Sequence, residues 1–240
     1  MCGVFCFMKE KKTGTWKIWV VTIFLFAIVV AATIRVSTLP VLNFTAKGSK
    51  VHIVIDPGHG GFDPGKVGTM GTLEKDVNLN ISLKLREILT KSGYTVAMTR
   101  EKDEALCGET TGKKKVEDLN ARLAVIDKEK PELTVSIHQN SYSAGTKGAQ
   151  VFYYSCSEEG KRLANVLQET IKEEMGDGNH RVEKANDSYY MLKKSSGPFV
   201  IIECGFLSNP EEEKLLISEE YQQKMAKAVA EGIEKFLYNE

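Results

Sequence analysis

The sequence predicts an α/β fold in which helices flank a single, mainly parallel sheet of six strands. After residue 50, short apolar runs alternate with stretches whose apolar residues recur every three or four positions. Such alternation is typical of parallel strands joined by helices that cover both faces of a sheet. Because 42% of the chain is hydrophobic, residues 51–240 can bury one sizeable core, and we expect them to form one domain.

Each expected element rests on its own pattern. The expected strands are the apolar runs at 51–55, 94–98, 133–137, 148–154, 189–192 and 199–202. The helix predicted over 75–91 repeats apolar residues at three- and four-residue intervals and ends before Gly93. Similar spacing predicts helices around 119–126, 163–171 and 219–237. Asn209 before Pro210 indicates one more helix start, because asparagine caps a helix and proline fits its first turn.

Four residues of metal-binding type fall where the predicted elements meet loops: His59, Glu74, His138 and Glu203. Open α/β sheets bind ligands outside the carboxyl ends of their strands, so we expect these four side chains to share one crevice. Catalytic zinc typically takes three histidine or glutamate ligands and leaves a fourth position for water. One residue of the four is therefore spare, and a spare carboxylate beside such a water is a general base.

The N-terminus indicates export. Residues 18–34 form an uncharged, almost wholly apolar run preceded by several lysines. A length of about 17 residues is the lower limit for a membrane-spanning helix, and the upstream lysines predict a cytoplasmic tail at 1–17. We expect a transmembrane or signal segment at 18–34, a linker at 35–50, and a membrane-anchored domain outside the cytoplasm. Cleavage near the small residues at 30–32 would instead give a secreted protein.

Composition excludes some functions. A formal net charge of zero gives no electrostatic case for nucleic-acid binding. Five cysteines without a CxxC pair do not describe a disulfide framework. Cys204 neighbours Glu203, but successive side chains of a strand point to opposite faces, so we interpret Cys204 as a packing residue. The glycine-rich stretch at 58–68 is not followed by the GK[ST] of a phosphate-binding loop.

For several polar residues the sequence is compatible with two different roles. Asp56 and Asp63 are either turn residues or acceptors that support a ligand histidine. Asn140 and Ser141 either hold substrate or end their strand. The acidic run at 211–213 is most simply a solvated helix face.

Five segments resemble one family. In this order, VIDPGHGGFDPG, LEKDVNLNISLKLREIL, GYTVAMTRE, SIHQNS and IIECGFLSNPEE are similar to segments of the zinc-dependent N-acetylmuramoyl-L-alanine amidases of bacterial cell walls, the Amidase_3 group. The resemblance covers residues 51–238. It implies that His59, Glu74 and His138 bind Zn²⁺, that Glu203 is the catalytic acid and base, and that peptidoglycan is the substrate. Gln139 departs from the family, which often has a small or apolar residue there.

A narrower resemblance concerns the biological role. The chain size, the membrane segment, the lack of wall-binding repeats and the stretch GETTGKKKVEDLNAR are most similar to the germination amidases of endospore formers. This resemblance implies that the enzyme trims stem peptides in spore cortex, which enables muramic lactam formation and later germination. An accessory protein partner is compatible with this role. The same metal chemistry would also suit a wall carboxypeptidase or deacetylase, and a peptidoglycan-binding scaffold without turnover is the non-enzymatic alternative.

Overall fold

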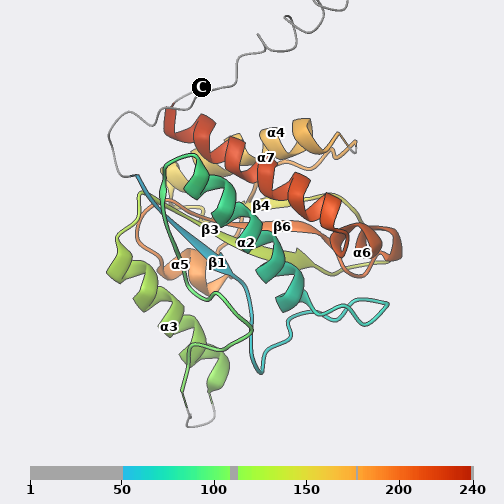
Figure 1. Ribbon diagram of the computed structural model, residues 1–240, viewed down its shortest axis with the longest axis horizontal. Coiled ribbons are helices and arrows are strands. Elements are labelled where there is room, and N and C mark those ends of the chain that lie inside the picture. Colours follow the sequence, from blue (N-terminus) through green and yellow to red (C-terminus); the bar gives the residue numbers. More distant parts are fainter. Residues whose placement is uncertain (1–50, 109–112, 177, 239–240) are drawn as a thin grey trace, which may run out of the picture. The chain divides into compact units, whose positions relative to one another are not determined.

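A six-stranded sheet separates two layers of helices in the domain (Figure 1). Its strands, in the spatial order β2-β1-β3-β6-β4-β5, are β2 (Thr95–Met98), β1 (His52–Pro57), β3 (Leu133–Asn140), β6 (Phe199–Phe206), β4 (Gln150–Tyr153) and β5 (Lys184–Ala185). The first four strands in this order are parallel, and β4 runs antiparallel to β6. The prediction of one mainly parallel six-stranded sheet is therefore confirmed.

The computed structural model describes residues 51–108, 113–176 and 178–238. The predicted tail at 1–17, membrane segment at 18–34 and linker at 35–50 lie outside these residues. Within the described part of the chain, no helix has both the length and the apolar character needed to cross a bilayer.

The helices are α2 (Glu74–Lys91), α3 (Lys114–Glu129), α4 (Glu158–Met175), α5 (Tyr190–Lys194), α6 (Pro210–Leu216) and α7 (Glu219–Tyr238). The contacts of α2, α4 and α7 with one another place them on one face of the sheet, and α3 and α5 cover the other. The helix predicted over 75–91 starts one residue earlier, at Glu74. Asn209 caps α6 as expected, because its side chain accepts the backbone N–H groups of Glu211 and Glu212.

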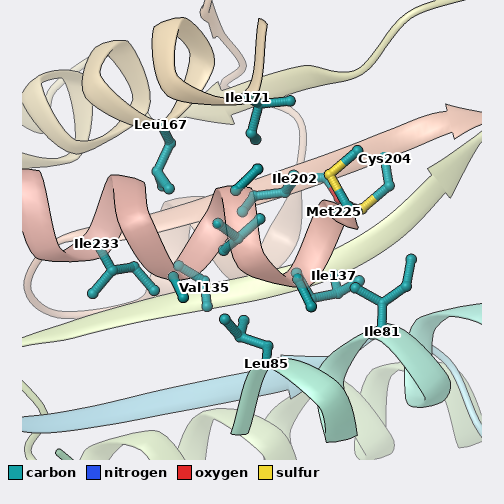
Figure 2. Packing of buried hydrophobic residues seen from close by; sticks show 14 of the residues in the cluster. Ile81, Leu85, Val135, Ile137, Leu167, Ile171, Ile202, Cys204, Met225 and Ile233 are labelled. Carbon is teal, nitrogen blue, oxygen red and sulfur yellow. The ribbon is translucent and has the colours of Figure 1, made fainter. Parts of the chain in front are cut away.

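The alternation of side chains along the strands produces two apolar clusters. On the face of α2, α4 and α7, Val135, Ile137 and Ile202 pack against helix residues that include Leu85 and Ile233 (Figure 2). A smaller cluster around Val54, Ile126 and Ile201 fills the opposite face. Burial of this apolar surface is the main source of stability for such a fold.

Cys204 belongs to the larger cluster and is fully buried (Figure 2). Burial raises the pKa of the Cys204 thiol, so it stays protonated. Its neighbour Glu203 lines a cavity on the opposite face. The interpretation of Cys204 as a packing residue is confirmed.

The predicted strand at 189–192 is wrong. Tyr190 begins the short helix α5, whose buried residues Met191 and Leu192 face the sheet. Four consecutive apolar residues fit a strand or one helical turn equally well, so periodicity could not separate them. The sixth strand is instead β5, an exposed Lys-Ala pair that its backbone pairing with β4 defines and that carries no apolar signal.

The acidic run at 211–213 is not the solvated face that we expected. Glu213 is fully buried and accepts the Thr69 hydroxyl at 2.5 Å and the backbone N–H of Met70 at 3.0 Å. Glu212 is also buried and accepts the N–H groups of Gly148 and Phe206. These two carboxylates satisfy backbone N–H groups that would otherwise lack partners, and they connect α6 to the loop at 69–72, to Gly148 and to the end of β6.

Parallel pairing brings the functional segments to one edge of the sheet. His138 on β3 lies directly beside Glu203 on β6, and Asp56 on β1 lies beside Ser136 on β3. Residues that share a register position in parallel strands present their side chains on the same face. The end of β1, the end of β3 and the end of β6 therefore meet around one crevice, as strand order and α/β topology predict.

Candidate active site

His59 stands in the loop that follows β1, with its backbone in the left-handed region at φ 61°. Its ring nitrogen Nδ1 lies 3.0 Å from Oδ2 of Asp63. A carboxylate only accepts hydrogen bonds, so Nδ1 carries the hydrogen and Nε2 is available to bind a metal ion. Nε2 lies 3.1 Å from Oε1 of Glu74. Asp63 thus takes the supporting role that sequence reasoning had left open.

Glu74 is the first residue of α2 and is almost completely buried. Its Oε2 accepts the backbone N–H of Lys66 at 2.7 Å, and its Oε1 accepts that of Gln139 at 3.1 Å. Burial alone would raise the pKa of Glu74, but the neighbouring imidazoles of His138 and His59 outweigh it and hold that pKa below its ordinary range. Glu74 is therefore an anion, held in place by loop N–H groups and by two imidazoles.

His138 reaches the same oxygen from β3. Its Nδ1 lies 3.0 Å from Oε1 of Glu74, and its ring meets that of His59 edge to face, with centroids 5.0 Å apart. Burial would lower the pKa of His138, but the adjacent Glu74 carboxylate raises it. The imidazole packs directly on Gly58, where any Cβ would lie 2.2 Å from Cε1 of His138. Glycine at this position is what allows the ring to lie against the loop.

The three side chains form a donor set that fits zinc. One ligand atom each from His59, Glu74 and His138 lies within 4.8 Å of the others. Ligand atoms around a tetrahedral zinc at about 2.1 Å would lie about 3.4 Å apart. The observed separations of 3.0 and 3.1 Å from Oε1 of Glu74 to the two ring nitrogens are close to this value. Two imidazoles and one carboxylate are also a ligand set of catalytic zinc sites.

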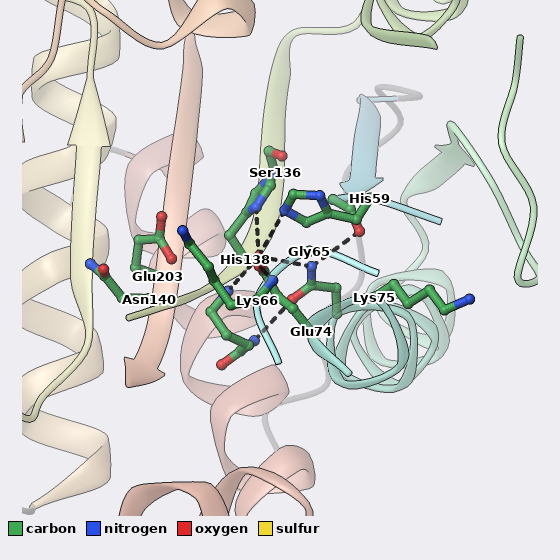
Figure 3. Close-up of polar contacts among 12 residues, drawn as sticks. His59, Gly65, Lys66, Glu74, Lys75, Ser136, His138, Asn140 and Glu203 are labelled. Atoms are coloured by element: carbon green, nitrogen blue, oxygen red, sulfur yellow. Dashed lines mark hydrogen bonds and ion pairs between the residues drawn. The ribbon is translucent and has the colours of Figure 1, made fainter. Parts of the chain in front are cut away.

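Glu203 projects into the same crevice from β6 (Figure 3). Only 7% of it is exposed; Oε1 is 3.5 Å from the hydroxyl of Tyr189, and Oε2 has no hydrogen-bond partner. Burial raises the pKa of Glu203 to about 7, with the negative charge of Glu74 adding to the rise and His138 opposing it. A buried carboxyl with one free oxygen and a pKa near neutrality suits a general base.

A cavity of about 240 Å³ joins these groups. Its lining residues are His59, Lys66, Glu74, His138, Gln139, Asn140, Ser141, Tyr189, Ile201 and Glu203. All four residues selected from the sequence are present, and so is Asn140, whose Oδ1 accepts the N–H of Ser141. A larger cavity of about 510 Å³ near α6 contains none of the four.

Two polar residues that line the cavity were not among the candidates from the sequence. Tyr189 was assigned to a strand, and its contact with Glu203 depends on the tertiary fold. Lys66 belongs to the glycine-rich stretch at 58–68, which was considered only as a possible phosphate-binding loop. The unusual Gln139 contributes its backbone N–H to Glu74, whereas its side chain donates to Oδ1 of buried Asn78. A glutamine at position 139 therefore affects the hydrogen bonding of buried Asn78 beneath the site.

The donor set and the buried carboxyl group beside it are those of a metal-dependent hydrolase. Comparison with known proteins narrows the class. The chain belongs to the N-acetylmuramoyl-L-alanine amidase family, whose model matches residues 53–235.

Individual relatives agree with this assignment. The germination-specific N-acetylmuramoyl-L-alanine amidase of Bacillus subtilis is 37% identical over 188 residues, which cover 77% of this chain and 78% of that protein. The CwlD amidase from Clostridioides difficile, solved in complex with the GerS lipoprotein, is 42% identical, with a TM-score of 0.76 over 79% of this chain and 99% of that one. The amidase AmiC2 of Nostoc punctiforme is 35% identical, with a TM-score of 0.70 over 79% and 98%.

The raised pKa of Glu203 predicts how the metal-free protein responds to pH. The folded state holds a proton up to about pH 7, whereas the unfolded chain releases it near the ordinary value of 4.5. The contribution of Glu203 to stability is thus fully present below the unfolded pKa and is lost as pH rises through the folded pKa. Glu203→Gln removes this loss, so at about pH 8 the variant should be more stable than wild type by roughly 1–3 kcal/mol.

Denaturant unfolding in the presence of a chelator, from about pH 5 to pH 8, measures the difference. The gap between variant and wild type should widen with pH. Glu211→Gln, on the exposed side of α6, is the control and should follow the wild-type curve. Parallel curves for Glu203→Gln and wild type would contradict the raised pKa.

Proposed function

We propose that this chain is a zinc-dependent amidase in which His59, Glu74 and His138 hold the metal and Glu203 is the catalytic base. The bond it cleaves joins the lactyl group of N-acetylmuramic acid to L-alanine in peptidoglycan. One observation supports this assignment above the others: Glu203, a buried carboxyl group whose Oε2 has no hydrogen-bond partner, lines the same cavity as the three proposed metal-binding side chains. Family membership supports the choice of substrate.

We assign a role in the reaction to the metal and to Glu203 from their positions in the site. When bound, zinc supplies Lewis-acid stabilisation of negative charge and lowers the pKa of water in the site. The Glu203 carboxylate takes a proton from the attacking water, and the hydroxyl of Tyr189 lies 3.5 Å from its Oε1. As the carbon–oxygen bond forms and the carbon–nitrogen bond breaks, Glu203 returns that proton to the alanine nitrogen. The products are a lactyl carboxylic acid and a free stem peptide.

The surrounding residues prepare this step. Asp63 fixes the tautomer of His59, and the N–H groups of Lys66 and Gln139 fix both oxygens of Glu74. Asn140 lines the cavity beside Glu203, and we assign it to substrate contact (Figure 3). Burial of Glu203 keeps its basicity near neutral pH, where proton transfer by a carboxylate is most effective.

Two substitutions separate the proposed roles. Glu203→Gln should retain stoichiometric zinc but lose turnover by at least about a hundred- to a thousandfold, because the amide cannot accept the proton. His138→Ala should lose both zinc and turnover, because one ligand is gone. Metal analysis and mass spectrometry of muropeptide products measure both properties, and Glu211→Gln is the control for surface charge.

Product identity also tests the reaction. Release of free stem peptide indicates an amidase, whereas release of acetate or terminal D-alanine would indicate a deacetylase or a carboxypeptidase. Most of the wild-type activity remaining in Glu203→Gln would contradict the assignment of the base.

We further propose that the enzyme acts on spore cortex, where removal of stem peptides allows muramic lactam to form before germination. The germination-specific relative and the sequence features shared with endospore-former amidases support this role. A strain lacking the protein should make cortex without muramic lactam, and the wild-type gene should restore it whereas Glu203→Gln should not. Cortex with a normal lactam content in the deletion strain would refute the role.

We propose that residues 18–34 anchor the catalytic domain, residues 51–240, on the outer side of the membrane. The support is the apolar run with its upstream lysines, with 1–17 as a cytoplasmic tail and 35–50 as the linker. Full-length protein should stay with membranes after an alkaline wash, and a form lacking 1–34 should be released. Recovery of the wild type as a soluble, N-terminally shortened protein would instead indicate signal cleavage.

An accessory protein completes the proposal. A similar amidase was solved in complex with a lipoprotein, which supports a protein partner for this chain also. If the purified chain alone reached full turnover with zinc, the partner would be unnecessary.

A further inference from the structure

Two buried arginines lie beneath the loop that carries His59, and the proposed reaction gives them no role. Arg100 is 2% exposed and Arg122 is 1% exposed. They lie in segments that the sequence singled out without a function, GYTVAMTRE and GETTGKKKVEDLNAR. Arginine is rarely buried without a specific purpose, because removing its charge from water is costly.

Arg100 binds backbone oxygens. Its Nε donates to the carbonyl of Pro57 at 2.9 Å, and its Nη2 donates to the carbonyls of Gly58 at 3.0 Å and Lys75 at 2.9 Å. Its Nη1 donates to the carbonyl of Lys102 at 3.1 Å. One guanidinium group thus joins the loop after β1 to the first turn of α2, which begins with Glu74.

Arg122 reaches the same loop from α3. Its Nη1 donates to the carbonyl of Pro57 at 2.7 Å, and its Nη2 donates to the carbonyl of His59 itself. The same side chain pairs with Asp56 at 2.8 Å and with Asp118 at 2.7 Å. Asp56 is in turn held by the hydroxyl groups of Thr99 and Ser136.

The loop needs these donors because of its conformation. After β1 the chain leaves the sheet through left-handed angles at His59, Gly60 and Gly61. A histidine in this region is strained, and such strain persists only where the surroundings fix the backbone. The carbonyls of the three consecutive residues 57–59 all accept hydrogen bonds from the two arginines. These bonds therefore fix the conformation that directs Nε2 of His59 toward Glu74.

The charges in this cluster balance. Arg122 pairs with both carboxylates, Asp56 and Asp118, and Arg100 binds backbone carbonyls, so these four side chains together carry no formal net charge. The network therefore affects a bound cation through the position of His59 and not through its own charge. A planar guanidinium group with a fixed fork of donors suits this task, whereas a lysine ammonium cannot reach several carbonyls at once.

We propose that Arg100 and Arg122 are positioning residues for the metal centre: they hold the loop at 57–59 so that His59 is presented as a ligand, and they thereby set the affinity for zinc. The inference rests on the proposed function, because it assumes that His59, Glu74 and His138 bind the metal. Arg100 and Arg122 do not line the cavity and do not belong to the group of proposed metal ligands. They contact the loop at 57–59 only through its backbone carbonyls.

Arg122→Lys tests the proposal in the purified full-length chain. The substitution keeps the positive charge beside Asp56 and loses the simultaneous bonds to Asp118, Pro57 and His59. Zinc affinity, measured by competition with a chromogenic chelator, should fall about 10- to 100-fold, as is usual for groups that orient a metal ligand. Turnover at saturating zinc should fall much less than affinity does.

Arg86→Lys is the matched control. Arg86 lies on α2, is partly exposed and pairs with Glu101, so the same change there should leave zinc affinity within about twofold of wild type. Ser136→Ala is a milder variant for the case that Arg122→Lys does not fold. It removes one hydrogen bond to Asp56 and should weaken zinc binding in the same direction by a smaller factor.

The outcomes are distinguishable. If wild type binds zinc stoichiometrically and both folded variants, Arg122→Lys and Ser136→Ala, bind it as tightly, the positioning role is wrong although the proposed function stands. Lower thermal stability of these variants with an unchanged zinc dissociation constant would assign the arginines to folding alone and would also overturn the inference. If wild type binds no zinc, the proposed function itself fails.

Discussion

The structure depends on one shared oxygen. Oε1 of Glu74 lies 3.1 Å from Nε2 of His59 and 3.0 Å from Nδ1 of His138, and it also accepts the backbone N–H of Gln139. These contacts connect the start of α2, the loop after β1 and the end of β3. Because Glu74 is almost completely buried, its charge is stabilised by these neighbours and by any cation bound among them. The rest of the site is arranged around this anion.

One crevice contains two carboxyl groups whose pKa values are shifted in opposite directions. Glu74 accepts several hydrogen bonds and stays ionised, whereas Glu203 is buried with one oxygen unpaired and has a raised pKa. Environments that move the pKa values of neighbouring acids apart are a general way to assign different roles to the same residue type. The two pKa values differ because Glu74 is hydrogen-bonded by backbone N–H groups and by an imidazole, whereas burial dominates at Glu203, whose hydrogen-bond contact is the Tyr189 hydroxyl at 3.5 Å.

The sheet and the convergence of the candidate site residues could be predicted because their signals are local. Strong apolar runs gave β1, β3 and β6, and the polar residues that follow those runs gave His59, His138 and Glu203, although β3 and β6 continue past the last two to Asn140 and Phe206. The pair β5 could not be found, because its only signal is hydrogen bonding to β4. The short apolar run at 189–192 was predicted as a strand but forms a helix, because a run of four residues fits a strand or one helical turn equally well.

Residues whose roles depend on tertiary contacts were harder to predict. Glu213 is a surface acid by sequence, but it binds a loop 141 to 144 positions away in the chain. Arg100 and Arg122 belong to recognisable segments, yet nothing local shows that both donate to the carbonyls of one loop. Tyr189 contacts Glu203 only because α5 folds back against β6. Buried polar networks are specified by the whole fold, and their partners are distant in sequence.

A crystal structure of the zinc-loaded protein, with the metal located by anomalous scattering, tests the central claim most directly. The account predicts one ion bound by Nε2 of His59, a carboxylate oxygen of Glu74 and a ring nitrogen of His138, with Glu203 across the open coordination position and not bonded to the metal. An ion held elsewhere, or one with Glu203 as a direct ligand in place of Glu74, would contradict it.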